Sequence, residues 1–276
     1  MNALHPRFAG SGPTPGWPGR IGLRMRRHFL LKLVGTTFFT WLFFIAYFHL
    51  LRHPASAVYL MPLTALDHAI AFQPSMLAAY LSLWVYVGVG PGLQLRFVEL
   101  VVYGCWACAL CVAGLACFYF WPTAVPPPAF DASNHAGFAM LQGVDAAGNA
   151  FPSMHVAIAI FTAIRIEEVL RGAGVPALLR AFNLLWFLAI AWSTLAIKQH
   201  VVLDVLGGAA LGLVFAAASL RWRPGTARLP LSSSTAAAAP LPGPKPRPAS
   251  PHPAGHAPTD APTGPPPANP TTSTPS

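Results

Sequence analysis

The stretch LLKLVGTTFFTWLFFIAYFHLL, residues 30–51, has 22 residues and one charged side chain, Lys32. About 20 apolar residues in a helix are enough to cross the hydrocarbon core of a bilayer. Only 9% of the 276 residues of the chain are charged, whereas a soluble domain usually carries about 25%. The length of the stretch and the composition of the chain together indicate an integral membrane protein.

Five further stretches have a similar character. The six predicted spans cover roughly residues 30–51, 75–93, 97–121, 153–170, 181–197 and 201–220. Each has about the length that a helix needs to cross a membrane, and the last three carry polar residues at their ends. We therefore predict an all-α integral membrane protein in which residues 29–222 form a bundle of six transmembrane helices.

The positive charges follow this topology. The formal net charge of +9 would also fit a nucleic-acid-binding protein, but only Arg52 and Lys198 of the 17 Lys and Arg residues fall on the outer side if the N-terminus is cytoplasmic. The positive-inside rule predicts this asymmetry, and losing one span would disturb it. The basic N-terminus is therefore a topology signal that faces anionic lipid, and no nucleic-acid partner is expected.

Two segments outside the predicted bundle lack the composition of a packed core. Residues 1–28 are rich in Gly and Pro and are expected to form a mobile cytoplasmic arm. From about residue 223 to 276 the chain consists mainly of Pro, Ala, Ser, Thr and Gly, with 16 of its 30 prolines. Such a segment buries too little apolar area to offset its ordering entropy, which predicts a disordered cytoplasmic tail. The outer loop before the second span is expected to contain a short interfacial helix within residues 62–72.

Polar residues of the C-terminal half gather at one predicted level of the membrane. Ser153 and His155 open the fourth span, whereas Lys198, His200 and Asp204 lie where the fifth span gives way to the sixth. The fourth span runs inward, the fifth returns and the sixth runs inward again, so all five residues are expected at the outer surface. Ionisable groups at membrane depth are costly and indicate functional sites. Asp67 and His68 in the first outer loop face the same side and are weaker candidates.

The spacing of these residues favours phosphate chemistry. His200 and Asp204 are four residues apart and share a helix face, so the carboxylate can hold one imidazole nitrogen and leave the other as a nucleophile or base. Ser153 begins a helix whose N-terminus favours an anion, and Lys198 adds a positive charge. His155 is placed to protonate a leaving oxygen. Singly, these residues also fit a helix cap, a snorkelling lysine and interfacial histidines, but five together favour a site.

Two motifs resemble the type-2 phosphatidic acid phosphatase superfamily, which contains membrane lipid phosphatases and related phosphotransferases. FPSMH (151–155) contains the Pro-Ser-x-His signature of the family, and KQHVVLDVLGG (198–208) contains the His and Asp of its Ser-Arg-x5-His-x3-Asp signature. Ser193 keeps the spacing to His200 in that second motif. The six-helix core of the family also matches the six predicted spans.

The resemblance implies a mechanism and roles for the site residues. His200 would attack phosphorus and form a phosphohistidine, Asp204 would orient His200, and His155 would protonate the leaving lipid alkoxide. Ser153 and Lys198 would hold phosphate oxygens. No metal and no other cofactor is implied.

The sequence departs from the family pattern at two points. Thr194 stands where the family has Arg, and the Lys-x6-Arg-Pro signature that precedes the other two is missing. With Lys198 as the main cation, a phosphodiester or a diphosphate is favoured over a dianionic monoester. LQGVDAAGNAFPSMH (141–155) is similar to the branch that includes inositol phosphorylceramide synthase. In that reading Asp145 and Asn149 contact an acceptor hydroxyl; otherwise they are turn residues.

We therefore predict a membrane enzyme that hydrolyses a lipid phosphate ester or diphosphate at the extracytoplasmic face. Phospholipid headgroup transfer is the alternative, and a non-catalytic membrane protein or transporter that keeps the fold is a second one. The intact Ser153, His155, His200 and Asp204 argue against a non-catalytic protein, and a transporter would be expected to have charged or broken helices at the membrane centre. The expected location is the plasma (inner) membrane with both termini cytoplasmic. The expected partners are the bilayer and the lipid substrate, and no oligomeric state is predicted.

Overall fold

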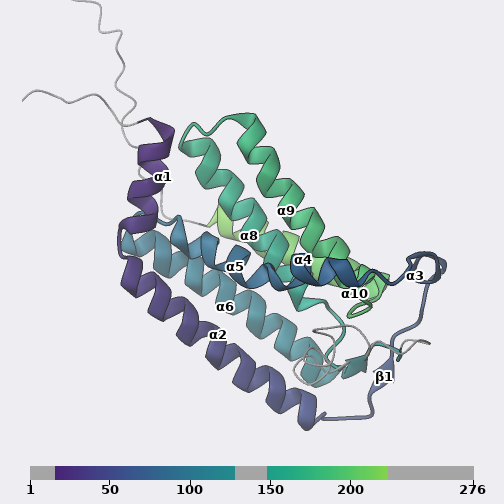
Figure 1. Ribbon diagram of the computed structural model, residues 1–276. Helices are drawn as coiled ribbons and strands as arrows, with labels where there is room; N and C mark the ends of the chain where they lie inside the picture. The colour runs from purple at the N-terminus through teal and green to yellow at the C-terminus, as the bar shows by residue number, and fades with distance from the viewer. Residues whose placement is uncertain (1–15, 128–147, 223–276) are drawn as a thin grey trace, which may run out of the picture. The chain divides into compact units, whose positions relative to one another are not determined.

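The computed structural model describes residues 16–127 and 148–222, and these are mainly helical (Figure 1). In chain order the described elements are α1 (Trp17–Arg26), α2 (Phe29–Arg52), β1 (Tyr59–Leu60), α3 (Ala65–Ala69), the 3-10 helix η1 (Pro74–Met76), α4 (Leu77–Leu81), α5 (Leu83–Gly92), α6 (Phe97–Phe120), β2 (Thr123–Ala124), α8 (Met154–Gly172), α9 (Ala177–Ala196) and α10 (Val202–Arg221). The two short strands pair in parallel, Tyr59 with Thr123 and Leu60 with Ala124. The tail predicted over residues 223–276 lies outside the described residues.

Within the described residues, five helical segments are long and apolar enough to cross a membrane. They are α2, the segment Pro74–Gly92 that contains η1, α4 and α5, then α6, α9 and α10. Their boundaries agree with the predicted spans to within a few residues. The all-α fold class is confirmed, and the apolar helices are compatible with an integral membrane protein. The remaining predicted span corresponds to the 19-residue α8, whose second half carries charged side chains and which is not apolar enough to be counted with the five.

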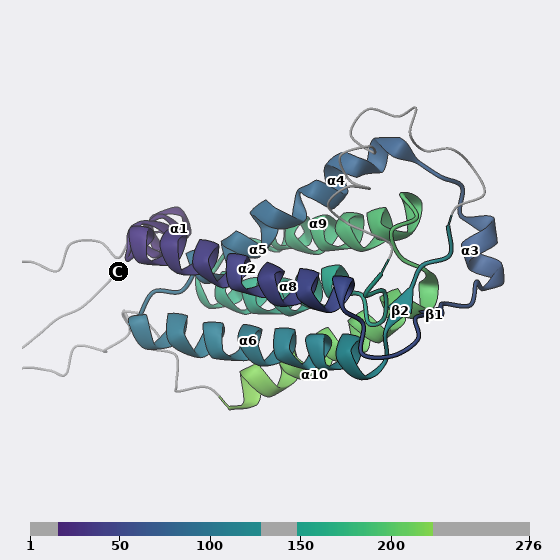
Figure 2. The ribbon, with the colours of Figure 1, turned by 90° about the horizontal axis from the view of Figure 1, so that it is seen from below.

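Charged side chains of α8 form ion pairs, Arg165 with Glu168 and Glu167 with Arg180 of α9. Helix α8 packs against α5, α6, α9 and α10, and the two views show α9 and α6 on either side of it (Figures 1 and 2). Arg165 is only 4% exposed and donates to Glu168 at 3.2 Å. The span count of six stays a prediction at α8.

Helix α2 has the opposite character and is apolar on its outer surface. Its exposed side chains include Leu30, Phe38 and Trp41, and of its 24 residues only Lys32 and Tyr47 are buried. A continuous apolar surface of this size is unusual for a soluble domain. It is typical of a helix that contacts lipid.

Close packing of α10 on α8 brings the first turns of the two helices together. A Cβ atom at Gly208 would lie 2.3 Å from the carbonyl oxygen of Ser153, and one at Gly212 would lie 2.4 Å from that of Ala157. Glycine at both positions therefore permits the approach of the two backbones. The N–H of Ser153 donates to the carbonyl oxygen of Asp204 at 2.9 Å. The residues predicted to form a site thus begin neighbouring helices.

The expectation of a mobile N-terminal arm is wrong for residues 17–26, which form α1. A proline in its first turn has the backbone angle that a helix start needs. The Lys32 ammonium donates to the carbonyl oxygens of Arg24 at 2.6 Å and Gly92 at 2.7 Å, and Arg24 donates to that of Leu93 at 3.3 Å. These tertiary contacts hold α1 against the end of α5.

Candidate active site

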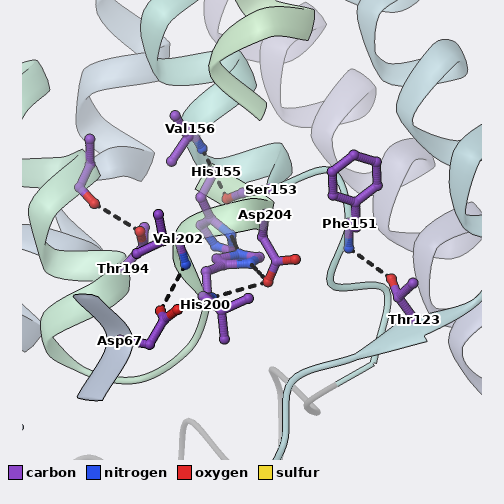
Figure 3. Close-up of polar contacts among 12 residues, drawn as sticks. Asp67, Thr123, Phe151, Ser153, His155, Val156, Thr194, His200, Val202 and Asp204 are labelled. Atoms are coloured by element: carbon purple, nitrogen blue, oxygen red, sulfur yellow. Dashed lines mark hydrogen bonds and ion pairs between the residues drawn. The ribbon is translucent and has the colours of Figure 1, made fainter. Parts of the chain in front are cut away.

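The structure brings His155, His200 and Asp204 together (Figure 3). His155 lies in the first turn of α8, His200 in the loop between α9 and α10, and Asp204 in the first turn of α10. Nδ1 of His155 is 3.3 Å from Nε2 of His200, and Nδ1 of His200 is 3.5 Å from Oδ2 of Asp204. The three side chains therefore form a continuous polar row, and their catalytic roles stay predictions.

Asp204 is the most deeply buried member of this row. It is 0% exposed, and its Oδ2 accepts a hydrogen bond from the N–H of Val201 at 3.1 Å. This backbone contact fixes the carboxylate at the start of α10. Its distance of 3.5 Å to His200 is longer than an ordinary hydrogen bond, so the pair is an electrostatic contact that places negative charge behind the imidazole. Within the described residues, Oδ1 of Asp204 has no hydrogen-bond partner.

Ser153 and Thr194 make local contacts with the backbone. Ser153 is fully buried and its hydroxyl accepts from the N–H of Val156 at 3.4 Å, as an N-cap of α8. Thr194, at the position where the family has Arg, donates to the carbonyl oxygen of Ala191 at 2.8 Å. The contacts of Ser153 explain how α8 begins, and its role in binding phosphate stays a prediction.

The ammonium of Lys198 contacts the backbone of the first loop. It donates to the carbonyl oxygens of Asp67 at 2.8 Å and Ile70 at 2.6 Å. Asn149 donates from its side chain to the carbonyl oxygen of Tyr47 at 3.0 Å, and its backbone has a positive φ of 54°. The geometry thus gives both residues a structural contact, while Asp145 lies outside the described residues.

Asp67 has a larger part in the site than its weak sequence signal indicated. One carboxylate oxygen accepts from the N–H and hydroxyl of Thr64 at 2.8 and 2.7 Å, and the other accepts from the N–H of Val202 at 2.8 Å (Figure 3). Burial alone raises the pKa of Asp67, but the hydrogen bonds from Thr64 and Val202 and the charge of Lys198 outweigh it and lower the pKa. A capping-box pattern, Thr64-x-x-Asp67, was the available signal. It explains why α3 forms inside the predicted interfacial segment.

Tyr80 of α4 is a site residue that sequence reasoning missed. Its hydroxyl oxygen lies 2.7 Å from Nε2 of His155, and the two ring centroids are 4.7 Å apart. Tyr80 is only 2% exposed. Its polar group near the start of an apolar span was the one visible sign, because a buried tyrosine hydroxyl usually has a partner.

A cavity of about 690 Å³ extends from the histidines into the bundle. Tyr80, His155 and His200 line it together with many apolar side chains of α2, α5 and α6. Leu31 and Tyr47 both line it, so at 1.5 Å per residue it follows α2 for about 24 Å. Lys32 is the cation among its lining residues. In residues 16–127 and 148–222 no group of three His, Cys, Asp or Glu side chains is arranged to hold a metal ion.

Comparison with known proteins agrees with the motifs. A sequence model of the PAP2 superfamily matches residues 100–228, which include His155, His200 and Asp204. No curated protein and no solved structure matches the chain. The match does not extend to the inositol phosphorylceramide synthase branch, which stays a prediction. The match over residues 100–228 is consistent with a member of the type-2 phosphatidic acid phosphatase superfamily, whose members are phosphatases and phosphotransferases.

Proposed function

We propose that the protein is a membrane lipid phosphatase that hydrolyses a lipid phosphate ester or diphosphate through a phosphohistidine on His200. One observation carries this proposal. The imidazoles of His155 and His200 face each other at 3.3 Å in the wall of a largely apolar cavity. That arrangement combines a nucleophile and an acid with space for an apolar chain.

In the first step, Nε2 of His200 attacks phosphorus as the bond to the lipid oxygen breaks. His155 gives a proton to that oxygen, and the lipid leaves as an alcohol from an ester or as a lipid monophosphate from a diphosphate. Asp204, 3.5 Å from the other nitrogen of His200, holds the ring and balances the charge that develops on it. In the second step, His155 accepts a proton from water, which attacks phosphorus and releases phosphate from His200. Transfer to water therefore returns both histidines to their starting states.

The position of the cations favours a substrate with little charge on the reacting phosphate. The ammonium of Lys198 is occupied by the carbonyl oxygens of Asp67 and Ile70. Lys32 also lines the cavity, but it lies about fifteen residues along α2 from Tyr47, another residue that lines it. A dianionic monoester usually needs several cations nearby. A phosphodiester needs fewer, and cleavage of a phosphodiester is the first step of headgroup transfer. Transfer of a phospho-headgroup to a lipid alcohol is therefore the second candidate function.

The proposed location follows from the charge asymmetry of the loops. We place the N- and C-termini in the cytoplasm and the histidines at the extracytoplasmic face of the plasma (inner) membrane. A cysteine-labelling experiment with an impermeant reagent tests this placement. A single cysteine introduced at exposed His68 in a chain without its four native cysteines is expected to react in intact cells.

Purified protein in detergent would be given phosphatidic acid, a polyprenyl diphosphate, and a phospholipid together with diacylglycerol or ceramide. Release of inorganic phosphate supports the phosphatase, and formation of a new phospholipid supports the transferase. His200→Ala is expected to abolish both activities and to prevent trapping of a labelled phosphoenzyme. His68→Ala is the matched control, because His68 is exposed on α3. Full activity of His200→Ala would overturn the mechanism.

A further inference from the structure

The two histidines of the site have corresponding arrangements. In His200, Nδ1 lies 3.5 Å from Oδ2 of Asp204, and Nε2 faces His155. In His155, Nε2 lies 2.7 Å from the hydroxyl oxygen of Tyr80, and Nδ1 faces His200. In each ring one nitrogen contacts an oxygen from another residue, and the other nitrogen points to the space between the rings.

A neutral imidazole carries its proton on one of its two nitrogens, so a hydroxyl oxygen that accepts from one nitrogen leaves the lone pair on the other. We propose that Tyr80 is a positioning residue for His155. Its hydroxyl oxygen accepts a hydrogen bond from Nε2 of His155, which keeps Nε2 protonated and leaves Nδ1 for proton transfer. This inference rests on the proposed function. It gives Tyr80 a positioning role toward His155, as the proposed function gives Asp204 one toward His200, but through a hydrogen bond of 2.7 Å instead of an electrostatic contact at 3.5 Å.

The proton balance of the proposed reaction is consistent with this arrangement. In imidazolium form, His155 donates from Nε2 to the Tyr80 oxygen and gives its Nδ1 proton to the lipid oxygen as the phosphorus–oxygen bond breaks. The neutral ring keeps its Nε2 proton, so the lone pair of Nδ1 can accept a proton from the attacking water. The same nitrogen thus acts as acid and then as base, and the hydroxyl of Tyr80 keeps its proton throughout.

Packing holds Tyr80 in this position. The plane of its ring lies at 32° to that of His155. Tyr80 also packs against Ile197 and Leu77 in a small apolar cluster. Ile197 is three residues before His200, so the loop that carries His200 and the residue that contacts His155 share one small core. Tyr80 lies outside residues 100–228, the range of the PAP2 match. The family motifs therefore do not point to Tyr80, and its role is inferred from the contact between α4 and His155.

The first test needs no substrate. Protein with ¹⁵N-labelled histidine would be studied by NMR in detergent, with the signals of His155 identified from their loss in His155→Gln. The expected wild-type ring is protonated at both nitrogens in its imidazolium form and keeps the Nε2 proton when a rise in pH makes it neutral, and Tyr80→Phe is expected to shift the neutral ring toward a mixture of tautomers. Unchanged His155 signals in Tyr80→Phe would overturn the inference. This result stands whether or not the protein proves to be a phosphatase.

The second test measures catalysis. Tyr80→Phe keeps the ring and removes the hydroxyl, so kcat is expected to fall by about tenfold to a hundredfold while KM changes little. The loss should be smaller for a nitrophenyl ester, because that leaving group needs little protonation. It should vanish in a His155→Ala background, since Tyr80 acts through His155. Equal losses with both leaving groups, or a full further loss in His155→Ala, would contradict the proposed role.

Tyr86→Phe is the matched control. Tyr86 is also buried and also loses a hydrogen bond in this variant, the one to Asn183 Oδ1 at 2.7 Å. Asn183 lies on α9 away from the histidines, so the kcat of Tyr86→Phe is expected to stay at the wild-type value. If the wild-type protein acts on none of the lipids above, the proposed function fails, and the NMR result alone decides the role of Tyr80.

Discussion

Lys198 shows how a charged residue can have partners that its sequence context does not reveal. Its backbone has a φ of 60°, a left-handed conformation that costs a non-glycine residue about 1–2 kcal/mol. Its ammonium donates to the carbonyl oxygens of Asp67 and Ile70. We infer that these hydrogen bonds hold the strained turn that precedes His200 and attach it to the first loop.

Replacement of Lys198 by Met separates this role from phosphate binding. The variant keeps most of the apolar stem and leaves two carbonyl oxygens without a charged donor. The free energy of unfolding is expected to fall by about 2 kcal/mol, as measured by thermal or denaturant unfolding in detergent. A variant of unchanged stability whose KM rises tenfold would instead place Lys198 on the phosphate.

The carboxylate of Asp67 predicts a dependence of stability on pH. Its pKa in the folded protein lies below its ordinary value of 3.8, so folding favours the charged form. The stabilisation is therefore complete above that ordinary value and is lost as the pH falls through the folded pKa. Asp67→Asn is expected to be less stable than the wild type at neutral pH, with a difference that narrows below about pH 4. Unfolding curves from neutral pH to about pH 3 check this, and a constant difference would refute it.

For single residues, the sequence predicted that His155, His200 and Asp204 lie close together but not how each side chain is directed. The order of the spans was enough to place His155 near His200, and the spacing of four placed Asp204 beside His200. The contact of Tyr80 with His155 arises from packing between α4 and the loop after α9. Such contacts depend on rotamers and loop geometry, for which the sequence has no periodic signal.

Among the helices, the closeness of α8 and α10 decides whether the site can form. Gly208→Ala would place a Cβ atom 2.3 Å from the carbonyl oxygen of Ser153, a backbone atom that cannot rotate away. Overpacking of this kind costs about 1–3 kcal/mol, and the displacement would also stretch the contact between Ser153 and Asp204. We expect Gly208→Ala to lower both the unfolding temperature and the rate of the proposed lipid phosphate hydrolysis.

Gly88→Ala is the matched control for this helix variant. No atom lies within 4 Å of a Cβ built at Gly88, and alanine favours a helix over glycine by about 1 kcal/mol. The control is expected to be as stable as the wild type or more stable, with the same activity. If Gly208→Ala behaved in the same way, the packing argument for α8 and α10 would be wrong.

The sequence predicted the helices well because apolar length is a strong signal. The boundaries of α2 and α6 differ from the predicted spans by a residue or so. Helix α8 was harder to classify, since its second half carries charged side chains, of which Arg165 is buried and Arg171 is exposed. Helix α1 was not expected, because its position depends on the contacts of Lys32 with Arg24 and Gly92, which no local pattern announces.

For the described bundle as a whole, the length of the cavity limits the substrates that fit. It follows α2 for about 24 Å, and the hydrocarbon core of a bilayer is about 30 Å thick. A chain that enters it from the histidines can therefore reach beyond the middle of the membrane. Because such a chain comes from lipid that is equally apolar, the cavity gains little from hydrophobic transfer. It should select substrates by shape and length.

Filling the cavity tests this selection. Gly35 and Gly104 both line it, and no atom lies within 4 Å of a Cβ built at either position, so Gly35→Phe and Gly104→Phe should occupy free space without distorting the helices. We expect kcat/KM to fall at least tenfold for long-chain lipid phosphates and to stay unchanged for a short-chain phosphate that reaches only His155 and His200. The measurement is kcat/KM across a series of chain lengths.

Gly88→Phe is the control for these variants, because Gly88 also has open space around it but is not among the residues that line the cavity. It should retain the wild-type profile at every chain length. Equal losses for short and long chains would mean that the phenylalanines disturb the histidines and not the chain. Unchanged rates for the longest chains would mean that the apolar chain of the substrate does not enter the cavity.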